Sequence, residues 1–388
     1  MRESLGIYLH FPFCVKKCSY CDFLSGPADS GTRKAYADAL CREIYSFGRE
    51  YGMRETLSRD GKIPVDTIFL GGGTPSVMDP EDLSRVMETV FKVFDVLPGV
   101  EISMEMNPGT FREEMLAFVK KYINRVSLGL QSADDRELQM LGRIHTYSEF
   151  ESCYGTLRDA GISNINVDLM SAIPGQTLAS WERSLDRVLR LRPEHMSCYS
   201  LIVEEGTPFY ALYEDGRLDL PGEDEEREMY YLTKQILETY GYHRYEISNY
   251  ALPGCECRHN IRYWRRSPYV GFGIGAASLL DETRWSNTRD LTRYLSGSGS
   301  LRDIREEIQD LSVSEQMEEF MFLGLRMMEG VSAADFAEAF GCELDSVFGA
   351  VCVRLISEGL LDREGDRYKL TSRGIDISNS VLAEFLLC

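Results

Sequence analysis

Apolar runs and amphipathic helical patterns alternate over the first 280 residues, and this leaves few architectures open to the chain. Each run is short enough for one buried strand, and the runs lie at 6–11, 65–70, 100–105, 124–130, 164–170 and 195–202. Helical patterns separate them, and the pattern at 80–94 follows Asp79 and Pro80, a strong helix start. Such alternation is typical of parallel strands joined by crossover helices. It predicts an α/β fold, a partial (β/α)6 barrel rather than a closed eight-fold one.

Polar residues stand at the ends of several of these runs. A glycine-rich turn at 71–75 follows the second run, Glu105 ends the third, Gln131 follows the fourth and Asp168 lies near the end of the fifth. Barrel enzymes build their active sites at the C-terminal ends of the strands. Because these positions agree in register, the sequence predicts that they belong to one site.

The pattern changes after the segment SGSGS at 296–300, which we expect to be a flexible boundary. We therefore predict two domains, 1–295 and 300–388. The second shows short helical patterns at 314–328, 332–340 and 343–358, followed by a turn-rich pair of strands, and we expect a small winged-helix-like domain. It holds 8 Lys and Arg against 18 Asp and Glu, so its charge argues against nucleic-acid binding.

Charge and cysteine content indicate the compartment. The net charge of −20 repels nucleic-acid phosphates and anionic lipids on average. No apolar run reaches the length of a membrane-spanning helix, and the N-terminal residues lack the pattern of a signal peptide. We therefore expect a cytoplasmic protein. In that reducing compartment, clustered cysteines among the 11 are metal ligands before they are disulfides.

Cys14, Cys18 and Cys21 form a CxxxCxxC pattern directly after the first predicted strand. Thiolates are soft ligands that suit zinc or iron–sulfur clusters. A structural zinc site usually takes four ligands in two pairs, and no second pair lies nearby. Three thiolates on one tight loop suit three irons of a [4Fe–4S] cluster, which leaves the fourth iron open for a non-protein ligand. A zinc knuckle is the structural alternative.

This spacing, with the aromatic Tyr20 before the last cysteine, resembles the motif of the radical S-adenosylmethionine (SAM) superfamily. The resemblance implies a partial barrel of the radical SAM type. It also implies that the amino acid end of SAM chelates the open iron, and that an electron from the cluster cleaves the sulfonium to an adenosyl radical. The hard chemistry then belongs to the cofactor, while the fold orients it.

In the coproporphyrinogen-dehydrogenase-like branch of that superfamily, further polar residues line the SAM pocket. The bare backbone of the glycine turn can approach a ligand closely and offer amide and carbonyl groups. Carboxylates suit ribose hydroxyls, and an arginine suits a carboxylate. The matching positions here are Tyr8, Tyr20, Gly72, Gly73, Thr74, Glu105, Gln131, Arg143 and Asp168, with Ser200 and Ala277 as weaker matches.

A second motif, HNxxYW, runs from His259 to Trp264. Together with YLHFPFC, GGGTPS, NVDLMSAIPGQT, EEGTPF and YEISNYA in the same order, it resembles the HemW family of heme chaperones. That family is related to the oxygen-independent coproporphyrinogen III dehydrogenases, and its motif histidine is taken as a heme ligand. Tyr263 and Trp264 offer flat apolar area to a porphyrin, and Asn260 suits a role in fixing the imidazole. The alternative is a core histidine beside structural aromatics.

Four arginines form a basic island around this motif: Arg258, Arg262, Arg265 and Arg266. Heme carries two propionates, which arginine pairs well. We therefore expect some of these arginines to hold the propionates, and we assign Arg265 and Arg266 to the heme site. Cys255 and Cys257 lie beside His259 without the CxxCH pattern of covalent heme. Either is a second axial ligand or an incidental thiol.

Two positions separate the branches of this family group. The dehydrogenases carry another cysteine two places after the third cluster cysteine, where Phe23 stands here. They also carry an N-terminal extension that contributes to the active site, whereas Tyr8 lies almost at the start of this chain. Both departures favour the chaperone.

Our first hypothesis is therefore a heme chaperone that carries a [4Fe–4S] cluster, SAM and heme and transfers heme to acceptor proteins of a respiratory chain. An electron donor is a further expected partner, a homodimer stays open, and no nucleic acid is expected. The second hypothesis is a coproporphyrinogen III dehydrogenase, an enzyme that oxidatively decarboxylates two propionates of its substrate. The third is a passive cluster or heme store.

Overall fold

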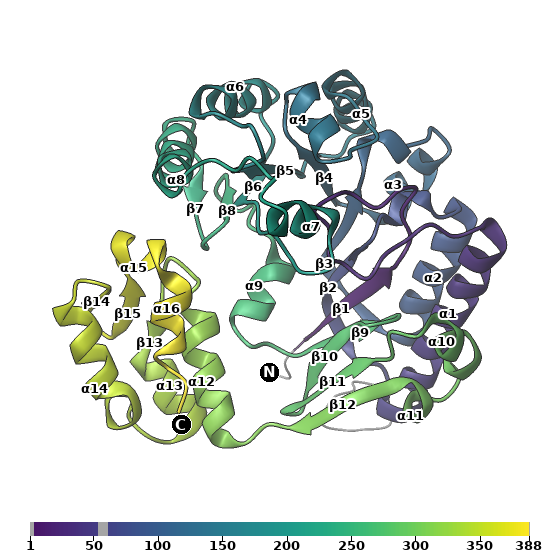
Figure 1. Ribbon diagram of the computed structural model, residues 1–388. Coiled ribbons are helices and arrows are strands. Elements are labelled where there is room, and N and C mark those ends of the chain that lie inside the picture. The colour runs from purple at the N-terminus through teal and green to yellow at the C-terminus, as the bar shows by residue number, and fades with distance from the viewer. Residues whose placement is uncertain (1–3, 53–60, 388) are drawn as a thin grey trace.

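The computed structural model describes residues 4–52 and 61–387. A 12-stranded sheet forms its larger part, in the order β12-β11-β10-β9-β1-β2-β3-β4-β5-β6-β8-β7 (Figure 1). Strands β1 to β6 run parallel to one another in chain order. They are β1 (Leu5–Phe11), β2 (Pro64–Gly72), β3 (Asp95–Met106), β4 (Arg125–Gln131), β5 (Ile165–Ser171) and β6 (His195–Ser200). The predicted partial (β/α)6 barrel is confirmed.

Shorter strands extend the sheet at both edges. β9 pairs in parallel with β1, whereas β10, β11 and β12 continue from it antiparallel. β8 and β7 close the other edge next to β6, also antiparallel. These strands are β7 (His243–Arg244), β8 (Asn249–Ala251), β9 (Tyr269–Phe272), β10 (Ala277–Leu280), β11 (Thr283–Asn287) and β12 (Arg305–Asp310).

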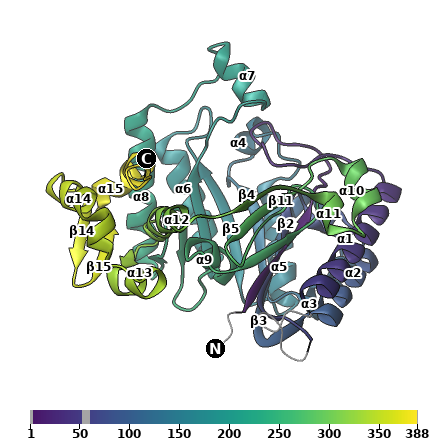
Figure 2. The same ribbon diagram turned by 90° about the horizontal axis from the view of Figure 1, so that it is seen from below.

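Crossover helices connect the parallel strands and cover the outer side of the sheet. Helices α1, α2 and α3 lie along β1, β2 and β3 (Figures 1 and 2). The predicted helix start at Asp79 is confirmed, because its side chain accepts the amide hydrogen of Glu81 at 2.9 Å. The helices are α1 (Ser30–Tyr51), α2 (Pro80–Val93), α3 (Met115–Tyr122), α4 (Asp135–Met140), α5 (Tyr147–Asp159), α6 (Leu178–Leu189), α7 (Pro208–Glu214) and α8 (Glu223–Thr239).

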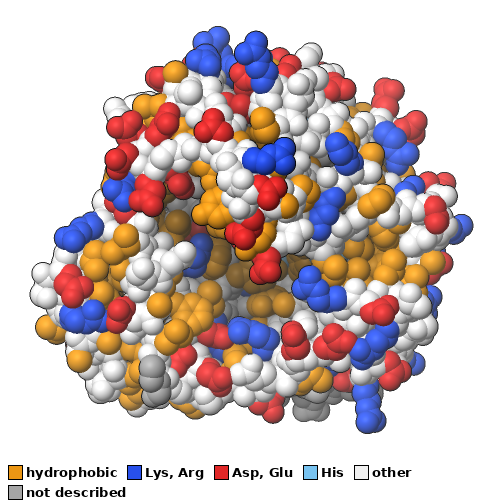
Figure 3. Space-filling view, viewed as in Figure 1, with side chains coloured by type: hydrophobic (Ala, Val, Ile, Leu, Met, Phe, Trp, Pro, Cys, Tyr) orange, Lys and Arg blue, Asp and Glu red, His pale blue; other side chains and the backbone are white. Residues whose placement is uncertain are grey.

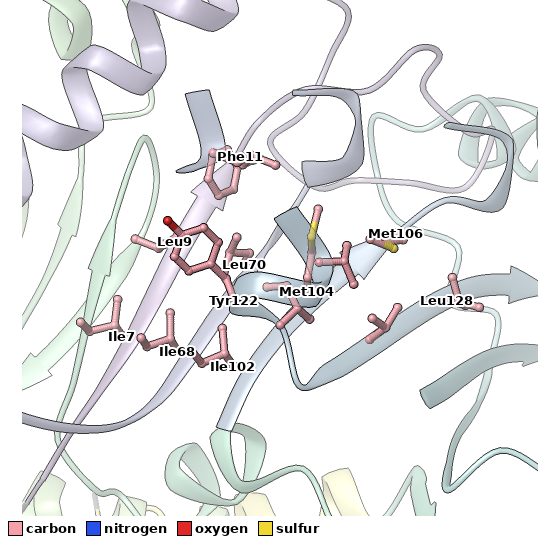
Figure 4. Packing of buried hydrophobic residues seen from close by; sticks show 14 of the residues in the cluster. Ile7, Leu9, Phe11, Ile68, Leu70, Ile102, Met104, Met106, Tyr122 and Leu128 are labelled. Atoms are coloured by element: carbon pink, nitrogen blue, oxygen red, sulfur yellow. The ribbon is translucent and has the colours of Figure 1, made fainter. Parts of the chain in front are cut away.

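Alternation along the strands divides the barrel into an apolar outer layer and a polar interior. Figure 4 shows two rows of apolar side chains that cross β1, β2 and β3 on the same face as Tyr122 of α3. The rows consist of Ile7, Ile68 and Ile102, and of Leu9, Leu70 and Met104, which are partners in the parallel register. Residues that alternate with them along the strands, such as Tyr8, Phe69 and Glu105, point to the opposite face and line a cavity.

The C-terminal unit packs around a hydrophobic core of its own, centred on Phe336 and Phe348. It contains α12 (Val313–Gly324), α13 (Ala333–Phe340), α14 (Leu344–Ser357), α15 (Ser372–Asp376), α16 (Ser378–Ala383) and the strands β13 (Val331–Ser332), β14 (Leu361–Glu364) and β15 (Arg367–Leu370). β14 and β15 form the expected hairpin. The predicted helical, winged-helix-like unit is therefore present.

The segment 296–300 differs from the flexible boundary that the sequence predicts. It lies between α10 (Leu291–Gly297) and α11 (Leu301–Ile304) and packs on α1. Ser298 is fully buried and its hydroxyl accepts from Arg42 Nε at 3.1 Å, while Ser46 donates to the carbonyl of Gly299 at 2.9 Å. Strand β12 follows and still belongs to the large sheet, so the chain leaves that sheet only after Asp310.

Helix α9 (Arg258–Trp264), which carries the HNxxYW motif, lies between β2 and the C-terminal unit (Figure 1). Just beyond its end, Arg266 pairs with Glu319 of α12 at 2.7 Å. The same carboxylate pairs with Arg284 of β11, also at 2.7 Å. Glu319 therefore connects the residue just after the motif helix to both α12 and β11. No helix in the described residues is long and apolar enough to cross a membrane.

Candidate cofactor site

A cavity of about 570 Å³ opens at the C-terminal ends of the parallel strands. It is bounded by the loop after β1, the turn after β2, the inner faces of β3 to β6 and the first part of α9. Cys14, Cys18, Cys21 and His259 all line it. The space-filling view is hollowed near its centre, where apolar side chains and charged side chains of both signs border the depression (Figure 3). The two motifs that the sequence places about 240 residues apart thus meet in one cavity.

The cysteine loop is fixed by backbone hydrogen bonds to two neighbouring segments. The amide of Cys14 donates to the carbonyl of Gly26 at 3.0 Å, and the amide of Ser19 donates to the carbonyl of Leu141 at 3.0 Å. Cys14, Cys18 and Cys21 are each partly exposed toward the cavity. Burial raises the pKa of the Cys21 thiol, a cost that metal coordination offsets because metals bind the thiolate. Three soft donors on one pinned loop fit an iron–sulfur cluster.

Arg143 links this loop to β4. One guanidinium nitrogen lies 3.6 Å from the sulfur of Cys18, and another donates to the carbonyl of Gly129. Its Nε is buried and has no hydrogen-bond partner among the described residues. The side chain therefore places positive charge beside a cluster cysteine and keeps one donor unused at the cavity wall.

The glycine turn passes very close to the end of β1. Gly72 has a φ of +104°, and a Cβ there would lie 2.3 Å from Nδ1 of His10. A Cβ on Gly73 would lie 2.7 Å from the carbonyl oxygen of Phe11. The amides of Gly72, Gly73 and Thr74 donate to Glu105, Phe11 and Phe13 respectively, at 3.0, 2.9 and 2.7 Å. The close approach is as expected, but these three amides are already engaged within the protein.

Two carboxylates face the cavity from neighbouring strands. Oε2 of Glu105 accepts the Gly72 amide, and burial together with the charge of Asp168 raises the Glu105 pKa to about 7. Asp168 accepts from Asn166 Nδ2 at 2.7 Å and from Ser127 Oγ at 3.2 Å. Burial also raises the Asp168 pKa. Both groups have oxygen atoms suited to ribose hydroxyls.

The remaining predicted SAM contacts divide into two groups. Tyr8, Tyr20, Gln131 and Ser200 line the cavity. Gln131 takes a φ of +76° and accepts from the Tyr199 hydroxyl at 2.9 Å, which fixes its amide group. Ala277, by contrast, lies exposed on β10 and is not among the lining residues. Its predicted SAM contact therefore lacks support, because β10 is an edge extension of the sheet.

His259 lies at the inner end of the cavity, with both ring nitrogens engaged. Nδ1 lies 2.9 Å from the hydroxyl oxygen of Thr67, Nε2 lies 2.9 Å from that of Tyr263, and the ring stacks on Phe69. Burial, with the charges of Arg262 and Arg125, lowers its pKa to about 3, so the imidazole is neutral. Asn260 and Tyr263 also line the cavity. A neutral imidazole can bind iron, but only after Nε2 leaves Tyr263 or Nδ1 leaves Thr67.

The other predicted heme contacts lie outside the cavity. The ring of Trp264 is covered by the guanidinium of Arg326, 4.5 Å from its centroid. Arg265 pairs with Glu329 at 2.8 Å, and Arg266 pairs with Glu282 and Glu319. The C-terminal end of α9 faces the C-terminal unit, so these three residues join the two units instead of facing a ligand.

The other two arginines of the basic island and the nearby thiols also have internal partners. Arg258 and Arg262 both pair with Asp66. Cys257 is buried against Glu101, and neither it nor Cys255 lines the cavity. The second axial position is therefore not supplied by these thiols in this arrangement.

Comparison with known proteins agrees with this geometry. Residues 8–188 match the radical SAM superfamily, and residues 311–377 match the HemN C-terminal domain. The heme chaperone HemW of Bacillus subtilis is 37% identical over 98% of this chain and 98% of its own length. HemW of Lactococcus lactis is 35% identical over 100% and 98%, and HemW of Escherichia coli is 31% identical over 98% of each. The chain belongs to the HemW family.

A solved structure from another protein shares the fold over nearly the whole of this HemW-family chain. Coproporphyrinogen III oxidase (HemN) from Escherichia coli superposes with a TM-score of 0.85, over 99% of this chain and 90% of its own. The two sequences are 21% identical, so the likeness concerns the fold alone. In this HemW-family chain, Phe23 lines the mouth of the cavity and is 63% exposed.

A second layer of polar residues inside this HemW-family barrel was not predicted from the sequence. Arg125, Ser127, Asn166, Ser197 and Asn249 all line the cavity below the predicted contacts. The signal was available, because inward-facing residues recur with period two along a strand. Counting back from Gln131 gives Ser127 and Arg125, and counting back from Asp168 gives Asn166. Asn249 is on a strand of three residues, which carries too little pattern to find.

Proposed function

We propose that this chain is a cytoplasmic heme chaperone that carries a [4Fe–4S] cluster and SAM in one cavity and passes heme to acceptor proteins. The observation that carries the proposal is the shared lining: Cys14, Cys18 and Cys21 occupy the same 570 Å³ cavity as His259 and Tyr263. A family of heme chaperones at 31–37% identity over nearly the whole chain supports the heme part.

The cofactor residues divide the work as follows. The three cysteines would hold the cluster, which when bound supplies an electron to SAM. Arg143 lies where it can pair a carboxylate while it donates toward Cys18. Glu105 and Asp168 accept hydrogen bonds, as ribose hydroxyls require. The glycine turn lets a ligand come close to the backbone without a side chain between them.

For heme we propose His259 as the iron ligand, with Asn260 and Tyr263 beside it. The low pKa of His259 keeps the imidazole neutral and able to coordinate. Tyr263 holds Nε2 when no heme is bound and releases it on binding. Trp264, Arg265 and Arg266 act instead in holding α9 to the C-terminal unit.

The partners that this proposal requires are heme, an electron donor and heme-accepting apoproteins, for which respiratory proteins are our candidates. The cysteines in the described part of the chain are unpaired, which suits the reducing cytoplasm. The absence of a spanning helix in the described residues means that heme would reach a membrane acceptor through a contact with that acceptor.

Anaerobic titration of the reconstituted protein with hemin tests the proposal. We expect saturable binding that is lost in His259→Ala and kept in His243→Ala, a matched change at a partly exposed histidine paired with Glu256. Transfer to an apocytochrome should then follow. A parallel incubation with coproporphyrinogen III and SAM should give no protoporphyrinogen. Failure to bind hemin, or formation of that product, would contradict the proposal.

A further inference from the structure

Arg125 is a buried cation at the cavity wall that forms no salt bridge with a carboxylate of the described residues. Its residue exposure is 2%, and it lines the cavity. It makes no ion pair within 4.0 Å with any residue in the described ranges. Its one side-chain contact there is a 3.4 Å hydrogen bond to Ser103 Oγ, and its Nε has no partner.

The buried carboxylate of Glu101, which is linked to Arg125 through Ser103, is engaged by backbone amides. Glu101 accepts the amide hydrogens of Arg258 at 2.9 Å and His259 at 3.0 Å, and so caps the start of α9. Ser103, which accepts from Arg125, donates to Glu101 at 3.5 Å, and Arg125 also feels the charges of Glu101 and Asp168 without an ion pair to either. A buried charge is costly unless it is paired and hydrogen-bonded. Arg125 therefore has donors left for an anion that comes from the cavity.

The position of Arg125 indicates which ligand brings that anion. Arg125 and His259 line the same cavity. Glu101 fixes the backbone at His259 and faces Arg125 through Ser103. An acidic ligand bound at His259 therefore shares this cavity with Arg125. Nearby, Asn249 has an Oδ1 that is buried and unpartnered, so the wall around Arg125 is not yet satisfied internally.

We infer that Arg125 binds a propionate of the heme carried in this cavity. The inference rests on the proposed function and adds the carboxylate subsite that Arg265 and Arg266, paired with glutamates outside the cavity, do not supply. The guanidinium offers the planar donor pair that a carboxylate accepts. The carboxylate of SAM is the other source of the same chemistry, and the experiment separates the two.

The test compares hemin with hemin dimethyl ester, which keeps the ring and the iron but lacks both carboxylates. Wild-type protein should bind hemin at least about tenfold more tightly than the ester, as a charge-assisted hydrogen bond requires. Arg125→Gln should bind the two porphyrins alike, with its ester affinity unchanged, which also shows that the variant is folded. Arg265→Gln is the matched control and should keep the wild-type preference.

A preference for hemin that survives in Arg125→Gln would overturn the inference. So would weaker SAM binding in that variant with the porphyrin preference intact, because the subsite would then belong to SAM. If Arg125→Gln does not fold, Arg125→Lys decides, since it keeps the charge but loses the planar donor pair: an undiminished preference overturns the inference. If wild-type protein binds neither porphyrin, the proposed function itself fails.

Discussion

Nε2 of His259 lies 2.9 Å from the hydroxyl oxygen of Tyr263, one turn further along α9. The two rings meet edge to face, with centroids 5.1 Å apart. The residue proposed to bind iron is therefore held by a residue of the same motif. Residues four apart lie on the same face of a helix, so the spacing of His and Tyr in HNxxYW allows this hydrogen bond. The spacing therefore serves the structure of α9 as well as the proposed ligand site.

Removal of the Tyr263 hydroxyl should release this nitrogen. If iron binds Nε2, Tyr263→Phe should bind hemin two- to tenfold more tightly, because a hydrogen bond of about 1 kcal/mol no longer has to be broken. The free energy of unfolding should fall by about 1 kcal/mol, since a buried imidazole nitrogen loses its partner. Hemin titration and urea unfolding measure the two effects. Weaker hemin binding with normal stability would mean that Tyr263, not His259, holds the ligand.

SAM affinity should depend on pH through Glu105. Its pKa of about 7 means that the carboxyl is neutral at pH 6 and charged at pH 8. A charged carboxylate accepts a ribose hydroxyl more strongly, so SAM should bind several-fold more tightly at pH 8 than at pH 6. Equilibrium binding on the reconstituted protein measures this. In Glu105→Gln the dependence should shrink, and a dependence of unchanged size would contradict the assignment.

The same group makes a prediction for stability. The folded pKa of Glu105 lies above the unfolded value of about 4.3, so the folded state binds the extra proton between those values. The free energy of unfolding should therefore decrease as pH rises through this window toward 7. Glu105→Gln should remove that part of the slope in urea unfolding at a series of pH values. If the free energy of unfolding of Glu105→Gln decreased more steeply with pH than that of the wild-type protein, the result would contradict this assignment.

Much of this site was predictable from the sequence because each cofactor residue lies where a pattern ends. Glu105, Gln131 and Asp168 lie on β3, β4 and β5 toward their C-terminal ends, and all three line the cavity. Parallel strands bring their C-terminal ends to one edge of the sheet. The position of a residue near the end of its strand therefore predicts that it lies close to the others in the folded protein. The cysteine motif was likewise predicted to follow the first strand directly, and Cys14 lies in the loop after β1 and lines the cavity.

The errors arose where tertiary contacts decide the outcome. The composition of SGSGS predicts a flexible linker, but Ser298 is buried and its hydroxyl accepts a hydrogen bond from Arg42 of α1. The basic residues around Arg266 predict that its charge is available to a ligand, but in the folded chain Arg266 forms ion pairs with Glu282 and Glu319 from other segments. Composition near a motif does not reveal which acidic residues will meet it. The alternation along β4 places Arg125 on the inner face, but nothing in its local sequence shows that it forms no ion pair with the described residues.

Arg143 should tune the cluster. It places a guanidinium 3.6 Å from the Cys18 sulfur, and hydrogen bonds and positive charge near cluster sulfurs raise the reduction potential. Arg143→Gln should therefore lower the potential measured by an electron paramagnetic resonance (EPR) redox titration without SAM. Arg136→Gln, a change at an exposed arginine on α4, should leave the potential unchanged. Equal potentials in wild type and Arg143→Gln would exclude this role.

The Glu319 ion pairs should stabilise the contact between the barrel and the C-terminal unit. The Glu319 side chain is 7% exposed and pairs with Arg266 and Arg284, so Glu319→Gln leaves a largely buried arginine partly unpaired. We expect a loss of about 2 kcal/mol in urea unfolding. Lys121→Gln is the contrast: its pair with Glu88 is 60% and 61% exposed, and its loss should cost about 0–1 kcal/mol. Equal effects would show that Glu319 does not anchor the unit.

The central claim is that Cys14, Cys18 and Cys21 hold a cluster whose open iron faces the pocket of Glu105, Arg143 and Asp168. Anaerobic EPR spectra of the reduced protein, recorded with and without SAM, test it most directly. The account predicts a [4Fe–4S] signal that changes when SAM is added, and no such change in Arg143→Gln combined with Asp168→Asn. A cluster signal that SAM leaves unaltered in the wild-type protein would contradict it.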